Sequence, residues 1–158
     1  MSNLARPSQR LEELGVVLPA PPVPAGLYQP SVQTGNLLFL SGVGPKLPDG
    51  SFVTGKVGAT VTFDAARNAA RLAGVELLAS IQGALGSIDR VTRVVKLLGM
   101  VNCAPGFNKT PAVIDGCSQL FFDVFGEHIA RSARSAVGMA ELPFDICVEI
   151  EAVIEFMP

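Results

Sequence analysis

The end of the chain carries the clearest alternation of apolar and polar positions. Every second residue from Ile146 to Phe156 is apolar, and carboxylates occupy most of the positions between them. A period of two predicts a β-strand that buries one face and leaves the other for polar groups. The residues that point toward the core are Ile146, Val148, Ile150, Ala152, Ile154 and Phe156, and those that point outward are Cys147, Glu149, Glu151, Val153 and Glu155.

A second strand-like run, residues 133–141, precedes this one and is separated from it by the break Leu142-Pro143-Phe144-Asp145. The two runs are neighbours in sequence, so we expect an antiparallel hairpin that closes near this break. Arg134 would then lie opposite residues 153–154.

The N-terminal part predicts one short helix and two strands. Residues 7–14 have the pattern of an amphipathic helix, and the proline-dense segment 18–24 is typical of an extended arm. Strands are expected over residues 29–34 and 36–41, around the turn Thr34-Gly35-Asn36. We therefore divide the chain into an arm, 1–25, and a domain, 26–158.

The middle of the chain alternates helices with a strand. Residues 42–58 contain five glycines and read as a loop. Thr62 is a candidate N-cap for an alanine-rich helix that ends near Leu85, and a strand follows over 89–101. Thr110-Pro111 predicts the start of a second helix, which ends at Phe125 before Gly126. The order β-β-α-β-α-β-β favours an α+β fold, with one mixed sheet and two helices packed on one face.

Composition narrows the function. Of 158 residues 49% are hydrophobic, and the mean hydropathy is +0.42, so a large core or a subunit interface is needed. No apolar run approaches the roughly 18 residues that span a bilayer. The net charge is −2 with no basic stripe, which makes nucleic acid an improbable partner. The first residues lack a hydrophobic leader, and we expect a cytoplasmic protein.

The cysteines and the single histidine predict no metal site and no metal cofactor. Cys103, Cys117 and Cys147 are widely spaced and odd in number. This spacing indicates buried thiols in a reducing compartment.

Arg134 and Glu149 are the candidate chemical groups. Arg134 stands among small residues, and its planar fork of donors suits a carboxylate; an ion pair with Glu151 or Glu155 across the hairpin is equally compatible with the sequence. Glu149 could handle a proton, and Glu151 on the same face could raise the pKa of Glu149. A solvated strand face is the alternative for these acids.

Three segments carry a resemblance to a known family. The run ARSAVGMAELPFDICVEIEAVIE, residues 133–155, resembles the C-terminal signature of the RidA/YjgF family of enamine and imine deaminases. Gly26-Leu27-Tyr28 and the run from Gly35 to Gly42 resemble its N-terminal motifs, and Phe125-Gly126-Glu127-His128 resembles its F-x-E-H helix end. The resemblance covers about residues 26–156.

The resemblance implies a chorismate-mutase-like fold and a site without a cofactor. It assigns substrate-carboxylate binding to Arg134 and a catalytic role to Glu149, which would orient the hydrolytic water. Tyr28 falls on the family's site tyrosine, Ser118 replaces an asparagine, and Ala136 stands where the family has a cysteine.

The implied reaction is hydrolysis of 2-imino or enamino acids to 2-keto acids and ammonia by a homotrimer with sites between subunits. In a flat hairpin Arg134 and Glu149 would lie about 15 Å apart at roughly 3.3 Å per residue, which also favours a shared site. The alternatives are a non-catalytic trimer that binds small acids or a protein partner, and an endoribonuclease. The acidic balance and the single histidine disfavour the ribonuclease.

Overall fold

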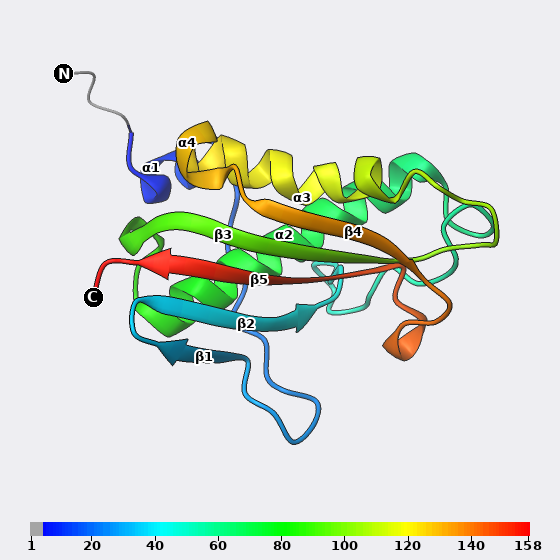
Figure 1. Ribbon diagram of the computed structural model, residues 1–158, viewed down its shortest axis with the longest axis horizontal. Coiled ribbons are helices and arrows are strands. Elements are labelled where there is room, and N and C mark those ends of the chain that lie inside the picture. Colours follow the sequence, from blue (N-terminus) through cyan, green and yellow to red (C-terminus); the bar gives the residue numbers. More distant parts are fainter. Residues whose placement is uncertain (1–4) are drawn as a thin grey trace.

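The computed structural model describes residues 5–158, so the first four residues, which belong to the stretch expected to lack a hydrophobic leader, lie outside the described residues. The sheet order is β1-β2-β5-β3-β4, and α2 and α3 pack on each other (Figure 1). The helices are α1 (Pro7–Glu13), α2 (Phe63–Leu85), α3 (Thr110–Phe125) and α4 (Glu127–Ala130); the strands are β1 (Ser31–Thr34), β2 (Leu37–Val43), β3 (Val91–Asn102), β4 (Ala133–Met139) and β5 (Val148–Phe156).

The sheet is mixed, as the sequence predicts. All neighbouring strands are antiparallel except β3 and β4, which are parallel. The two long helices lie together on one face of the sheet (Figure 1). The expected α+β fold is therefore confirmed, and the helices α2 and α3 begin and end close to the predicted residues.

The expected hairpin between β4 and β5 is wrong. β3 lies between them and pairs with both, so Arg134 is in register with Leu97, and Leu97 with Ala152. The reason is burial: β3 and β5 supply the most deeply buried apolar side chains and take central positions. β4, built mainly of small and partly exposed residues, forms an edge. Apolar burial outweighs closeness in sequence here.

The alternation along β5 is confirmed with one exception. All six predicted inward residues are buried. Cys147, predicted to point outward, is fully buried because it precedes the first residue of β5. Its amide donates to the carbonyl of Val53, so the segment around Val53 covers it.

The ends of the two long helices follow local chemistry. The Thr62 hydroxyl accepts from the amide of Ala65, and Gly86 ends α2 with a φ of 77°. Thr110 does not cap α3. It is buried at the first residue of the helix, and its hydroxyl donates to the Ala136 carbonyl at 3.0 Å. Thr110 thus ties α3 to β4.

Small residues let α2 and α3 approach closely. The buried face of α2 includes Ala66, Ala70 and Ala73. Gly116 of α3 lies against the backbone of α2, and a Cβ atom added there would be 2.0 Å from the Arg67 carbonyl oxygen. This contact fixes the height of α3 above the sheet.

The described part of the N-terminal arm, from Ala5 onward, contacts the helical layer. Leu11 of α1 is buried, and the amide and hydroxyl of Ser8 both donate to the Asp89 carboxylate at 2.8 Å. Pro21 then packs on Gly83 of α2 before the chain enters β1. The boundary between an arm and a domain at residue 25 stays a prediction.

No helix within residues 5–158 has both the length and the apolarity to cross a bilayer.

We predict that Gly116→Ala destabilises the protein more than Gly74→Ala. Alanine improves helix propensity by about 1 kcal/mol at both sites, but overpacking costs about 1–3 kcal/mol. At Gly116 the obstacle is backbone, whereas at Gly74 it is the ends of the Leu120 and Cys117 side chains, which can shift. Urea unfolding measures both; an equal loss for the two variants would contradict the backbone contact.

Candidate functional site

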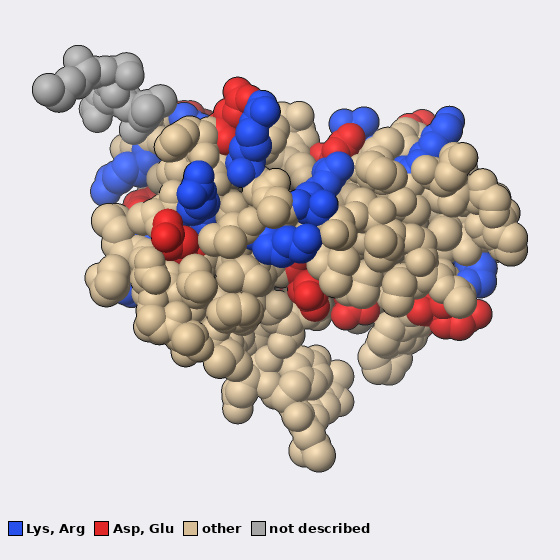
Figure 2. All heavy atoms as spheres, viewed as in Figure 1, with Lys and Arg blue, Asp and Glu red and all other residues tan. Residues whose placement is uncertain are grey.

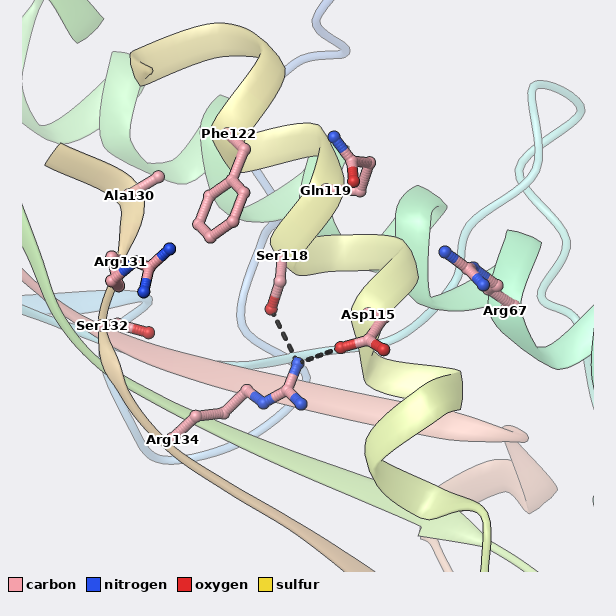
Figure 3. A pocket seen from close by; sticks show the side chains of 9 residues that line it. All are labelled: Arg67, Asp115, Ser118, Gln119, Phe122, Ala130, Arg131, Ser132 and Arg134. Carbon is pink, nitrogen blue, oxygen red and sulfur yellow. Dashed lines mark hydrogen bonds and ion pairs between the residues drawn. The ribbon is translucent and has the colours of Figure 1, made fainter. Parts of the chain in front are cut away.

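A cavity of about 300 Å³ opens beside Arg134, between α3, β4 and the segment that joins α4 to β4 (Figure 3). Its walls combine cationic, polar and apolar groups. The lining residues are Arg67, Asp115, Ser118, Gln119, Phe122, Ala130, Arg131, Ser132 and Arg134.

The Arg134 side chain rises from β4 toward α3 and is held at one end of its guanidinium (Figure 3). Its Nη1 donates to Asp115 Oδ1 at 2.7 Å and to Ser118 Oγ at 2.9 Å. The alternative expectation of an ion pair with Glu151 or Glu155 is wrong, because those carboxylates belong to the other face of the sheet.

The other edge of the guanidinium is largely free. Within residues 5–158 Nε of Arg134 has no hydrogen-bond partner, and Nη2 makes one long contact, 3.4 Å, to the Pro111 carbonyl. Nε and Nη2 are the pair of donors that can take a carboxylate side-on. The Arg134 side chain is 24% exposed, so part of it is within reach of a small ligand.

Glu149 and Tyr28 form a second group, around Gly42. A Cβ atom added at Gly42 would lie 2.2 Å from Glu149 Oε1, so the carboxylate rests directly on this glycine. Gly42 falls where the pairing of β2 with β5 changes register. Tyr28 lines a small recess together with Ser41 and Gly42, and its hydroxyl accepts from the Ala25 amide at 3.2 Å.

The pKa of the Glu149 carboxyl is raised above its usual value, mainly by burial and further by the charge of Glu151. The sequence-based expectation that Glu151 raises this pKa is therefore confirmed. A carboxyl whose pKa lies closer to neutrality is a better general base or acid at physiological pH than a fully solvated one.

Arg134 and Glu149 lie on opposite faces of the sheet within one chain. Arg134 shares its register with Leu97, which is buried under the helices, whereas Glu149 is in register with Met100 on the other face. Two strand spacings of about 4.8 Å and three residues of about 3.3 Å separate their Cα atoms by roughly 14 Å. The hairpin premise was wrong, yet the predicted separation holds.

The two remaining predicted residues, Ser118 and Ala136, both lie on the Arg134 side of the sheet. Ser118 lines the cavity and contacts Arg134. Ala136 lies one pleat beyond Arg134 on the same face, outside the cavity lining, and its carbonyl accepts from Thr110. One chain therefore brings Arg134 together with Ser118 and places Tyr28 and Glu149 each beside Gly42, but it does not join the two groups.

Sequence reasoning missed Asp115 and Gly42. Asp115 precedes Ser118 by three residues on the predicted helix, a spacing that places both on one helical face. That spacing was the available signal. Gly42 was part of a recognised motif, but its contact with Glu149 depends on the register shift in β2, which no local pattern reveals.

The cysteines are not arranged as nucleophiles. Burial raises the pKa of the Cys117 thiol to about 12 and that of Cys147 to about 11, so both stay protonated. Cys103 is only half-buried, which corrects the expectation that all three are buried. Residues 5–158 contain no cluster of histidine, cysteine or acidic residues suited to a metal ion.

Comparison with known proteins gives a consistent result. Residues 8–150 match the family described as "YjgF/chorismate mutase-like, putative endoribonuclease". The chain is 43% identical to protein TCP17 of Trypanosoma cruzi, covering 95% of this chain and 94% of that protein. It is 32% identical to a 2-iminobutanoate/2-iminopropanoate deaminase of Dermatophagoides farinae, covering 86% of this chain and 91% of that protein.

Solved structures agree with the fold. The protein Atu1372 of Agrobacterium tumefaciens, whose function is unknown, superposes with a TM-score of 0.86 at 43% identity, covering 96% of this chain and 94% of that one. TdcF of E. coli, solved with bound serine, superposes with a TM-score of 0.62 at 25% identity, covering 87% of this chain and 94% of that one.

We predict that Glu149→Gln stabilises the chain more at pH 7 than at pH 4. Because the folded-state pKa of Glu149 is raised, the native state retains a proton that the unfolded state loses, and stability falls as pH rises above the ordinary glutamate pKa of 4.5. Glutamine removes that loss. Urea unfolding at the two pH values measures the difference, with the exposed Glu12→Gln as a charge-matched control. A pH-independent difference for Glu149→Gln would contradict the raised pKa.

Proposed function

Because the chain belongs to the YjgF/chorismate mutase-like family, we propose that it hydrolyses small 2-imino and enamino acids to 2-keto acids with release of ammonia. The observation that carries the proposal is that Arg134 lines a cavity while its Nε has no hydrogen-bond partner within residues 5–158, so that Nε and Nη2 can take a carboxylate. The relative that is named as a 2-iminobutanoate/2-iminopropanoate deaminase supports the same substrate class.

Arg134 is proposed to bind the substrate carboxylate. The Nε and Nη2 donors would hold its two oxygens side-on, while Ser118 and Asp115 keep the guanidinium in its plane. Such a grip fixes the position of the adjacent C2 carbon, which is the electrophile. Positioning of this kind supplies much of the acceleration in a reaction whose substrate is already reactive.

Glu149 is proposed to orient and deprotonate the attacking water. The water oxygen adds to C2 of the protonated imine, and the carboxylate accepts one of its protons. The tetrahedral amino alcohol then collapses to the keto acid, and its nitrogen leaves as ammonia once it has received a proton. Tyr28, which shares Gly42 with Glu149, would line the same half of the site.

The two halves of the site lie toward opposite edges of the sheet, which supports a head-to-tail ring of subunits. Arg134 belongs to the edge strand β4, whereas Gly42 belongs to β2, next to the other edge. A heterologous contact between the two edges brings Arg134 of one copy toward Glu149 of the next and closes when the rotation fits. We propose a homotrimer with three such shared sites.

The surface on the β1–β2 side suits a contact with another copy. No charged residue occurs between Glu13 and Lys46, and the region of β1 and the preceding arm, at the bottom of Figure 2, shows no charged atoms. On the face away from the helices Val32, Phe39 and Val153 form one cross-strand row. Val32 is 55% and Phe39 45% exposed in the single chain. Burial of this row against another copy would remove apolar surface from water.

A non-catalytic role in binding small acids is the second candidate, favoured by the related TdcF structure with bound serine. Such a binding role requires the Nε and Nη2 donors of Arg134 but does not require Glu149. Ligand binding without ammonia release would favour this candidate over hydrolysis.

We predict that Arg134→Ala abolishes measurable binding of small 2-keto acids while the protein stays folded. Arg134→Lys should fail to restore binding, because an ammonium cannot take a carboxylate side-on. The matched control is Arg71→Ala, which removes an arginine of α2 that pairs with Asp123 and does not line the cavity. Calorimetric titration measures binding. Undiminished affinity in folded Arg134→Ala would show that the arginine is structural.

We predict that two inactive variants restore activity when their subunits are mixed. Arg134→Ala and Glu149→Gln should each release little ammonia from a freshly generated 2-imino acid. In a ring that pairs Arg134 of one subunit with Glu149 of the next, random 1:1 mixing leaves about a quarter of the sites intact. Co-expression with two different tags and an ammonia assay measure the recovery. Absence of recovery in a confirmed mixed oligomer would contradict a shared site.

A further inference from the structure

We propose that Asp115 is a positioning residue that sets how tightly Arg134 holds its ligand, so that the keto-acid product is released. The inference rests on the proposed function, since it takes the Arg134 edge as the carboxylate site. The observation behind it is that Arg134 already carries a carboxylate partner: Asp115 lies 2.7 Å from Nη1 and is 47% exposed.

The geometry makes this contact a fixed part of the site. Asp115 and Ser118 lie three residues apart on α3 and both accept from the same nitrogen of Arg134. Their helix cannot retreat toward α2, because the neighbouring Gly116 already touches the Arg67 carbonyl. The guanidinium is thereby held with Nη1 toward the helix (Figure 3), and within residues 5–158 its Nε has no hydrogen-bond partner.

The negative charge of Asp115 repels a carboxylate ligand, although its hydrogen bond orients the Arg134 guanidinium that would bind that ligand. A carboxylate on the Nε edge and the carboxylate of Asp115 share one guanidinium, so they repel each other within a few ångströms. The balance in the cavity depends on this acid, because Asp115 is the one carboxylate among nine lining residues that include three arginines. Asp115 therefore lowers the affinity of Arg134 for a carboxylate without changing the orientation of the guanidinium.

Weaker binding of the carboxylate is useful because the substrate and the product carry the same carboxylate. An interaction that is equally strong with both lowers the KM but does not raise the kcat, and it retains the product. We infer that Asp115 lowers the affinity for both forms, while the orientation of the guanidinium, on which the chemistry depends, is preserved.

Two substitutions separate the charge of Asp115 from its contact. Asp115→Asn keeps an oxygen that accepts from Nη1 but removes the negative charge, whereas Asp115→Ala removes both. Asp123→Asn is the matched control: it removes the same charge from α3, where Asp123 contacts Arg71 and accepts from Gln119. A surface ion pair without functional consequence would make all three variants equivalent in ligand binding.

The experiment is calorimetric titration of the intact protein and the three variants with pyruvate and 2-oxobutanoate, together with product inhibition of ammonia release. We expect Asp115→Asn to bind the keto acids about three- to tenfold more tightly than the unsubstituted chain, the size of one partly screened charge at this range. Asp115→Ala should bind more weakly than Asp115→Asn because its guanidinium is no longer held. Asp123→Asn should bind like the unsubstituted chain.

Unchanged or weaker binding by Asp115→Asn would overturn the inference, as would an equal gain in Asp123→Asn. The titration does not require turnover. A chain that shows the expected order of affinities but releases no ammonia would refute the proposed hydrolysis and leave the role of Asp115 standing. A chain that binds neither keto acid would refute both.

Discussion

The close contact between α2 and α3 at Gly116 is the constraint on which the Arg134 site depends. With a glycine there, the backbone of α3 rests against the Arg67 carbonyl, and the helix lies at a set height above β3 and β4. Asp115 and Ser118 flank that glycine, so the same contact places their side chains over Arg134. Thr110 adds a second tie between α3 and β4. Packing between helices thus determines the orientation of a guanidinium on an edge strand.

The sheet topology decides which chemical groups can meet. β4 lies at one edge, and its Arg134 faces the helices, whereas Glu149 projects from the other face of a central strand toward the bulged end of β2. Within a single chain the proposed anion-binding group and the proposed proton-handling group are therefore too far apart for one small molecule. The division gives a physical reason for association of subunits that is independent of the apolar surface.

The two halves also differ in their electrostatics. The charge of Arg134 is partly neutralised by the carboxylate of Asp115, whose side chain is 47% exposed. Glu149 is affected in the opposite way, since burial and the neighbouring Glu151 both disfavour its charge and raise its pKa. In the proposed function Arg134 would hold an anion moderately, and Glu149 would accept a proton more readily than a fully solvated carboxylate. Small imino acids require both properties and little else, because the C=N bond is already electrophilic once protonated.

Much of this protein follows from its sequence alone. Period-two and helical patterns placed the inward residues of β5 and the long helices α2 and α3, because burial of a continuous apolar stripe depends on local spacing. The type of the candidate residues was also visible, since an arginine among small residues and an alternating acidic strand stand out locally.

What only the tertiary structure decided was adjacency. The sequence suggests that β4 pairs with β5, but β3 displaces β4 to the edge because its long apolar face gains more from a central position. The partner of Arg134 is consequently Asp115, and the neighbour of Glu149 is Gly42. Such contacts join residues far apart in the chain, and their formation depends on the packing of whole elements, which local patterns do not encode.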